Sequence, residues 1–113
     1  MPQASSTWRK SGSYAANHGG ALVSAELALV GQANQVYLEY TFVGGGGTLT
    51  PVVVHPGETT EYSGAAIVAA GAGSGFAFVP VPPGAYLGFK VTGMAGGVTV
   101  SLRWRTVLTT MGG

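Results

Sequence analysis

Two stretches of this chain alternate between apolar and polar side chains, and this alternation constrains the fold more than any other feature. The stretches are "QVYLEYTFV" over residues 35–43 and "GVTVSLRWRTVL" over residues 97–108. A period of two is typical of a β-strand with one buried and one solvated face. The large apolar side chains that share a face are Val36, Leu38, Tyr40 and Phe42 in the first stretch, and Val98, Val100, Leu102 and Trp104 in the second.

Similar short runs continue along the chain, and turn residues separate them at intervals of about 8–12 residues. β-branched and aromatic residues fill these runs, as strands prefer, and no stretch has the 3.6-residue period of an amphipathic helix. The pattern predicts an all-β fold, an antiparallel β-sandwich with about eight strands, jelly-roll-like. An immunoglobulin-type sandwich is the close alternative. The runs cover residues 21–30, 35–43, 48–54, 58–63, 65–70, 75–81, 85–92 and 97–108.

Several local expectations follow from this assignment. Pro51 interrupts "TLTPVVV" and predicts an edge strand or a bulge, because proline lacks the N–H of a ladder bond. Pro56-Gly57 suits the centre of a type II turn. The side chains expected to be mostly buried are Leu38, Tyr40, Phe42, Phe78, Leu87, Phe89, Val100, Leu102 and Trp104.

The chain of 113 residues fits one domain. Residues 1–20, "MPQASSTWRKSGSYAANHGG", are polar and show no alternation, so we expect a flexible N-terminal arm. Residues 21–113 then form the sandwich domain. The first twenty residues hold no apolar run of signal-peptide length, and no stretch is long enough for a transmembrane helix, so neither is expected.

The composition argues against catalysis and against several binding classes. The chain has no cysteine and therefore no disulfide or thiolate zinc site. It also has no aspartate, so a Ser-His-Asp triad is impossible, and we expect no enzyme. Charged residues make up 8% and the net charge is +1, so there is no broad basic field for nucleic acid.

Two motifs resemble binding sites but are better explained as turns. "GGGGTLT" at residues 44–50 has no lysine and runs into a strand, unlike a phosphate-binding loop. His55 and Glu58 flank Pro56-Gly57, and the other histidine, His18, lies in the arm. A metal usually needs three or more protein ligands, so we expect no metal and no cofactor.

Two groups of residues are candidates for binding a partner. In the arm, Trp8 stands beside Arg9 and Lys10, and tryptophan and arginine often dominate binding energy. This tryptophan either packs back on the sandwich or anchors the arm to a partner. In the last run, Arg103 and Arg105 share a face and form a two-charge patch opposite the apolar one.

The scarcity of charge on the expected outer faces suits a surface that another subunit covers. The segments "VVVHPGETTEYS", "VPVPPGAYLGFKVTG" and "GMAGGVTVSLRWRTV" give the chain a texture that resembles the small β-sandwich virion proteins of tailed bacteriophages. It is most similar to capsid decoration, or cement, proteins. The resemblance implies a homo-oligomer, most often a trimer, that binds the major capsid protein where capsomers meet and stabilises the shell. It also implies a virion location at the capsid surface after synthesis in the host cytoplasm, and it transfers no catalytic residues.

Two alternatives stay open. One is a carbohydrate-binding module, although the chain has only two asparagines, Asn17 and Asn34, and no aspartate to bind sugar hydroxyls. The other is a structural module of a phage tail or fibre.

Overall fold

The structure, a computed structural model, describes residues 2–4, 8–19 and 28–109. These residues form strands and turns, and no helix in them is long and apolar enough to cross a membrane. The strands are β1 (Pro2–Ala4), β2 (Lys10–Tyr14), β3 (Ala28–Leu29), β4 (Gln35–Val43), β5 (Gly47–Val54), β6 (Tyr62–Ser63), β7 (Ile67–Ala69), β8 (Gly73–Pro80), β9 (Tyr86–Thr92) and β10 (Thr99–Thr109).

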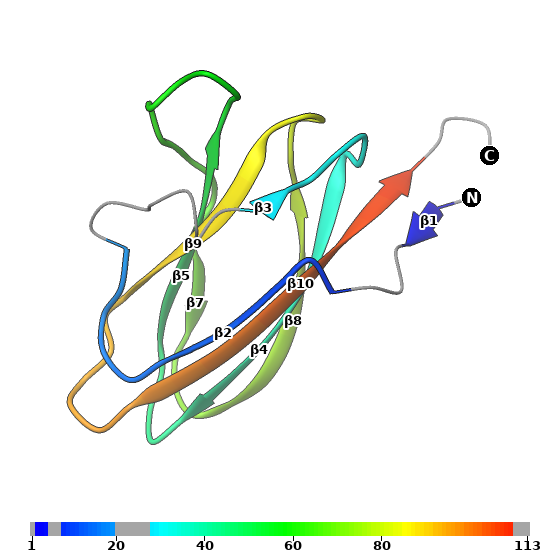
Figure 1. The fold of residues 1–113 in the computed structure, drawn as a ribbon. Coiled ribbons are helices and arrows are strands. Elements are labelled where there is room, and N and C mark those ends of the chain that lie inside the picture. The colour runs from blue at the N-terminus through cyan, green and yellow to red at the C-terminus, as the bar shows by residue number, and fades with distance from the viewer. Residues whose placement is uncertain (1, 5–7, 20–27, 110–113) are drawn as a thin grey trace.

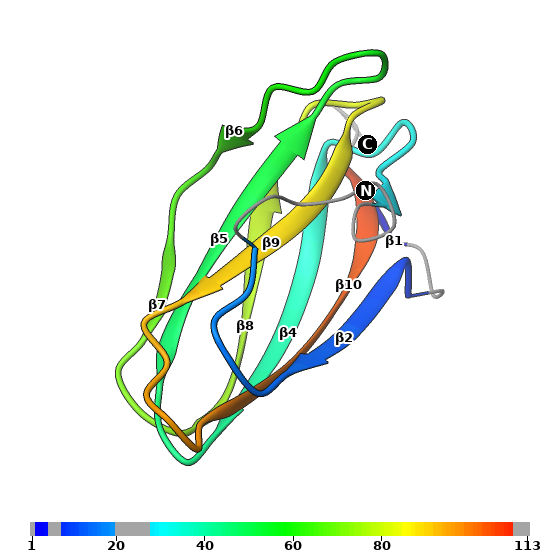
Figure 2. The ribbon, with the colours of Figure 1, turned by 60° about the vertical axis from the view of Figure 1, so that its left-hand side comes forward.

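The strands form two antiparallel sheets that pack face to face (Figures 1 and 2). In the first sheet, β10 pairs with β4 on one side and with β1 and β2 on the other, and β8 continues the sheet beyond β4. In the second sheet, β9 lies between β3 and β5, and the far side of β5 pairs with β6 and β7. The predicted antiparallel β-sandwich is therefore confirmed.

The strand pairs are nested in the sequence, which identifies the jelly-roll topology. β2 pairs with β10, β3 with β9, β4 with β8, and β5 with β6 and β7. One long hairpin rolled into two sheets produces this nesting, whereas the strand order of an immunoglobulin-type sandwich does not. The predicted number of about eight strands also fits, since β6 and β7 together occupy one position and β1 extends the position of β2.

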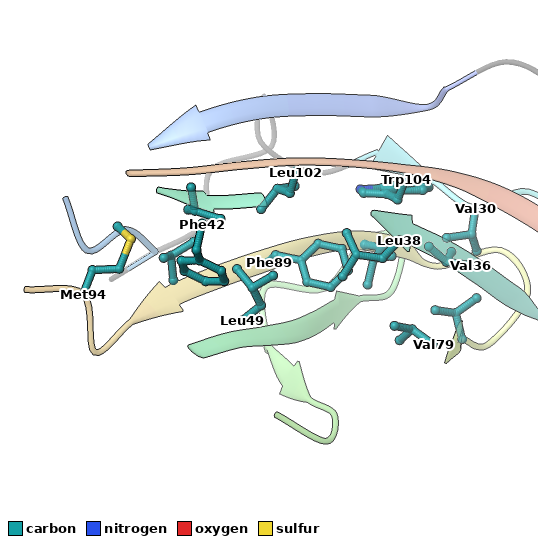
Figure 3. Close-up of a cluster of buried hydrophobic side chains, with 14 of the residues drawn as sticks. Val30, Val36, Leu38, Phe42, Leu49, Val79, Phe89, Met94, Leu102 and Trp104 are labelled. Carbon is teal, nitrogen blue, oxygen red and sulfur yellow. The ribbon is translucent and has the colours of Figure 1, made fainter. Parts of the chain in front are cut away.

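The core lies between the two sheets. Side chains of Leu102 and Trp104 from β10 meet Phe89 from β9 and Leu49 from β5 (Figure 3). Trp104 is fully buried, as are the largest apolar side chains around it. The alternation predicted for β4 and β10 is confirmed, because the four apolar positions of each stretch face the core and the intervening positions face outward.

One member of the predicted core is wrong and one is only partly right. Phe78 is 56% exposed on the outer face of β8, and Tyr40 is half-buried against the core. β8 turns its small residues inward, and the Tyr40 ring lies over Gly75: a Cβ added at Gly75 would lie 2.6 Å from the Tyr40 hydroxyl. The tyrosine fills the space that a larger inward residue of β8 would need, and this places both phenylalanines of the strand on the outer face.

Two other expectations need correction. Lys10–Tyr14, placed in the arm by the sequence, form β2 and pair with Val100–Trp104 of β10, so this part of residues 1–20 belongs to the sandwich. β5, expected to be an edge strand or to contain a bulge because of Pro51, is internal. The proline is accommodated because the ladder on one side is split there: β7 pairs with residues 47–49 and β6 with residues 52–53.

The glycine run makes the connection from β4 in the first sheet to β5 in the second. Gly44 has a φ of +85°, which favours glycine. Gly46 is constrained by space instead, because a Cβ there would collide with the backbone carbonyl oxygen of Ala69. Residues 55–58 likewise form a turn. The Glu58 N–H donates to the His55 carbonyl at 3.0 Å, and Gly57 has a φ of +78°.

The central position of Trp104 gives a stability prediction. Trp104→Ala should lower the free energy of unfolding by about 3–5 kcal/mol, because it removes a large buried ring and leaves a cavity. Chemical denaturation followed by circular dichroism measures this. Thr99→Ala, at an exposed position of the same strand, should change it by less than about 0.5 kcal/mol. Equal effects of the two substitutions would contradict the burial of Trp104.

The glycine run gives a second stability prediction. Gly46→Ala should destabilise the fold by about 1–3 kcal/mol, because either the β4–β5 connection or the backbone at Ala69 must shift. Gly71→Ala is the matched control, since a Cβ at Gly71 would meet nothing within 4 Å. Thermal unfolding measures the stability of both variants. If the chain needs flexible glycine in general, rather than space at residue 46, the two variants should lose the same amount of stability.

Candidate binding face

The outer face of the first sheet carries a continuous group of large side chains. Tyr37 of β4 lies beside Phe78 and Phe76 of β8, with ring centroids 5.4 Å and 6.0 Å apart. On the other side of β4, Arg105 and Arg103 of β10 are the cross-strand neighbours of Tyr37 and Glu39. Trp8 completes this group. We call it the aromatic–arginine face, and its members are Trp8, Tyr37, Glu39, Phe76, Phe78, Arg103 and Arg105.

Trp8 packs on this face against both arginines. The guanidinium carbon of Arg103 lies 4.1 Å from the centroid of the Trp8 ring, and that of Arg105 lies 5.1 Å from it. The Trp8 ring is also 6.3 Å from the ring of Tyr37. Cation–π contacts of this length are attractive, so of the two possibilities for Trp8 the structure shows the one in which it packs on the sandwich.

β2 and β10 hold Trp8 in this place. The N–H of Arg9, the next residue, donates to the Trp104 carbonyl at 2.8 Å, and the ladder between β2 and β10 begins at Lys10. The strand pairing therefore fixes the backbone on the C-terminal side of Trp8. The tryptophan is half-buried and leaves part of its ring available to a partner.

Glu39 is the one carboxylate of the aromatic–arginine face and is shared by two donors. Its Oε1 accepts from Nε and Nη2 of Arg103 at 3.0 Å and 2.8 Å, and its Oε2 accepts from the Tyr37 hydroxyl at 2.7 Å. These hydrogen bonds, that of Tyr37 first, lower the pKa of Glu39 below its ordinary 4.5. The hydrogen bond to Glu39 also raises the pKa of Tyr37 above 10.0.

The structure brings together three of the five residues that the sequence singled out for partner binding: Trp8, Arg103 and Arg105. Lys10 is different, because it pairs with Trp104 and therefore lies on the inward side of its strand. Arg9 is exposed beside the group. The sequence predicts two separate patches, one in the arm and one on a strand. In the folded chain Trp8 and the two arginines form a single patch.

Sequence reasoning missed the three aromatic residues of the face that come from β4 and β8. The alternation of residues 35–43 predicts that Tyr37 faces outward but indicates no role for it, no face follows for Phe76, and Phe78 is expected in the core. Phe76 and Phe78 are 62% and 56% exposed. The signal that could have found them is the small size of Gly75 and Ala77, the residues that alternate with them.

Three depressions adjoin the aromatic–arginine face, and the smallest of them, of about 380 Å³, has Tyr37, Glu39 and Phe76 in its lining. A shallow one over β2, β10 and β4 has a volume of about 410 Å³ and hydroxyl-bearing walls that include Ser11, Ser13, Thr41 and Ser101. An apolar groove of about 410 Å³ lies between the edge of β8 and the segment of β6 and β7. Phe78 belongs to the lining of this groove as well as to the face.

The two histidines make separate aromatic contacts. His55 packs against Tyr62 in the second sheet, with centroids 5.8 Å apart, and His18 stacks on Tyr14 at 4.3 Å. Among the described residues, no three side chains of histidine, cysteine, aspartate or glutamate form a group that could hold a metal ion.

No protein-family model matches the chain, and a search of curated proteins finds no similar sequence. The aromatic–arginine face is therefore interpreted from its own geometry and chemistry.

The hydrogen bonds of Glu39 predict a pH dependence of stability. Because the folded-state pKa of Glu39 is lowered, its stabilising contribution is present above about pH 4.5 and is lost as the pH falls through the lower folded value. The difference in melting temperature between the wild type and Glu39→Gln should therefore narrow as the pH falls below about 4.5. Glu58→Gln, in an exposed turn, is the control. If the difference in melting temperature between the wild type and Glu39→Gln does not change with pH, the charge of Glu39 contributes nothing to stability.

Proposed function

We propose that this chain is a structural protein of a tailed-bacteriophage virion, a capsid decoration or cement protein. In this proposal it binds the assembled capsid lattice and stabilises it, and the aromatic–arginine face is the surface that meets the major capsid protein. The observation that carries the proposal is the exposure of Phe76 and Phe78 beside Trp8 and two arginines on a single sheet face. Aromatic residues and arginine are the types enriched in protein interfaces.

Two further features support a binding protein that works by assembly. Charged residues make up only 8% of the chain, so much of the sandwich surface can be covered without burying charge. The jelly roll places the face on a broad, pre-formed sheet, so little ordering is needed when a partner binds. These features and the resemblance to decoration proteins agree with one another. The proposed homo-oligomer, a trimer, takes its number from that resemblance alone.

The mechanism is thermodynamic. A protein that binds the assembled lattice, but not the separate subunits, shifts the equilibrium toward the lattice by mass action. Many equivalent sites on one shell multiply a modest free energy per site. In this mechanism the chain requires no catalytic residue and no cofactor, and its effect on the shell increases with the fraction of sites occupied.

One observation favours carbohydrate binding as a second candidate. The shallow depression beside Glu39 is lined by hydroxyl groups, and Tyr37 lines a separate depression on the other side of Glu39 that also includes hydroxyl-bearing residues. Sugar sites combine such groups with a free carboxylate or amide, whereas both oxygens of Glu39 are already engaged within the face. A structural role in a tail or fibre would use the same face on a different partner, and electron microscopy of labelled virions distinguishes the two locations.

The proposal is tested by binding to purified shells of the phage that encodes the chain. We expect co-sedimentation with assembled shells and none with unassembled capsid subunits. Phe76→Ser should weaken shell binding at least about tenfold, as truncation of an interface aromatic does. Val68→Ser, at a position 72% exposed in the second sheet, should leave binding unchanged. Glycan-array binding without shell binding would reject the proposal in favour of the carbohydrate module.

A further inference from the structure

Arg105 occupies an unusual position within the aromatic–arginine face. Its guanidinium carbon lies 5.1 Å from the centroid of the Trp8 ring and 5.0 Å from that of the Tyr37 ring. Two aromatic rings, one on β4 and one on the segment just before β2, therefore hold one cation in place. Such a cation is ordered before any partner arrives, so binding to it costs less side-chain entropy.

No adjacent acid among the described residues matches the charge of Arg105. Glu39 hydrogen-bonds to Arg103 and to Tyr37 with its two oxygens, and it acts on Arg105 only through space. In the described part of the chain, no carboxylate lies within ion-pair distance of Arg105. Its Nε is buried and has no hydrogen-bond acceptor among the described residues, so a docked carboxylate would contact the terminal Nη groups of the guanidinium.

We propose that Arg105 is the anchor for a carboxylate of the docked protein, an aspartate or glutamate side chain flanked by apolar residues. The guanidinium offers a planar set of N–H donors that matches a carboxylate with two parallel hydrogen bonds. The flanking apolar residues of the partner would pack on Phe76 and Phe78, which extend the same face. This inference rests on the proposed function, since it specifies the chemistry of the surface that the face meets.

A protein carboxylate fits better than a nucleic-acid phosphate. The chain has a net charge of +1, and one of the two arginines of the face is already neutralised by Glu39. Binding to a phosphate backbone uses several lysines and arginines along a groove. A single cation surrounded by exposed aromatic rings suits one acid in an apolar setting instead.

The test uses the full chain and two synthetic peptides, acetyl-Leu-Glu-Leu-Glu-Leu-amide and the same peptide with glutamine in place of glutamate. Nuclear magnetic resonance titration should show at least about tenfold tighter binding of the glutamate peptide, with shifts in the Arg105 Nε–Hε signal. Arg105→Gln should abolish this preference. Arg105→Lys should keep part of it, because lysine retains the charge but not the planar set of N–H donors. Lys90→Gln, which removes one positive charge from the second sheet, should keep the preference in full.

Shell binding by the same variants separates this inference from the proposed function. We expect Arg105→Gln to weaken shell binding at least about tenfold while its melting curve shows a folded protein. If the wild type binds shells and Arg105→Gln binds them equally tightly, the role of Arg105 is overturned while the proposed function stands. If the wild type prefers the glutamate peptide but does not bind shells, the proposed function is rejected while the role of Arg105 stands. Equal binding of the two peptides by the wild type, or tighter binding of a single-stranded oligonucleotide, would also overturn the role of Arg105.

Discussion

In β10, apolar and polar side chains alternate from Val100 to Arg105 and connect the core of the sandwich with its outer face. The strand is the longest of the described part of the chain and contacts β1, β2 and β4. Its inward positions supply Trp104 and its neighbours to the core, and its outward positions supply Arg103 and Arg105 to the aromatic–arginine face. A slip by one residue would bury the arginines and expose the tryptophan. The packing of the core therefore also fixes the geometry of the face.

The sequence predicted the fold class and the faces of the long strands because these depend on local pattern. In β4 and β10 large apolar residues alternate with polar ones, so only one assignment of faces buries the apolar set. β8 was assigned wrongly at Phe78 because its alternate residues are small rather than polar. Hydrophobicity alone favours the phenylalanine for the core, and only the position of the Tyr40 ring over Gly75 shows why the strand faces the other way.

The candidate site was predictable only in part, because its members meet through pairing between distant segments. The residue types in Trp8, Arg103 and Arg105 marked them as binding candidates, but their contact depends on β2 lying beside β10. No local signal in the first twenty residues predicts that strand, whose serines and glycine resemble a linker. The role of Tyr37 likewise follows from its neighbours across the sheet, which the register of β4 with β8 and β10 determines.

The nested pairing of the strands also determines when the protein can fold. Among the described strands, only the pairs that β5 makes with β6 and β7 join segments close in the sequence, while β2 pairs with the distant β10. Proteins rich in such distant contacts fold slowly, because long loops must close before the contacts that stabilise them exist. During synthesis, β4 emerges before β10, so the edge of β4 that pairs with β10 stays unpaired until β10 has left the ribosome. The unpaired edge of β4 therefore exposes the newly made chain to aggregation until β10 becomes available.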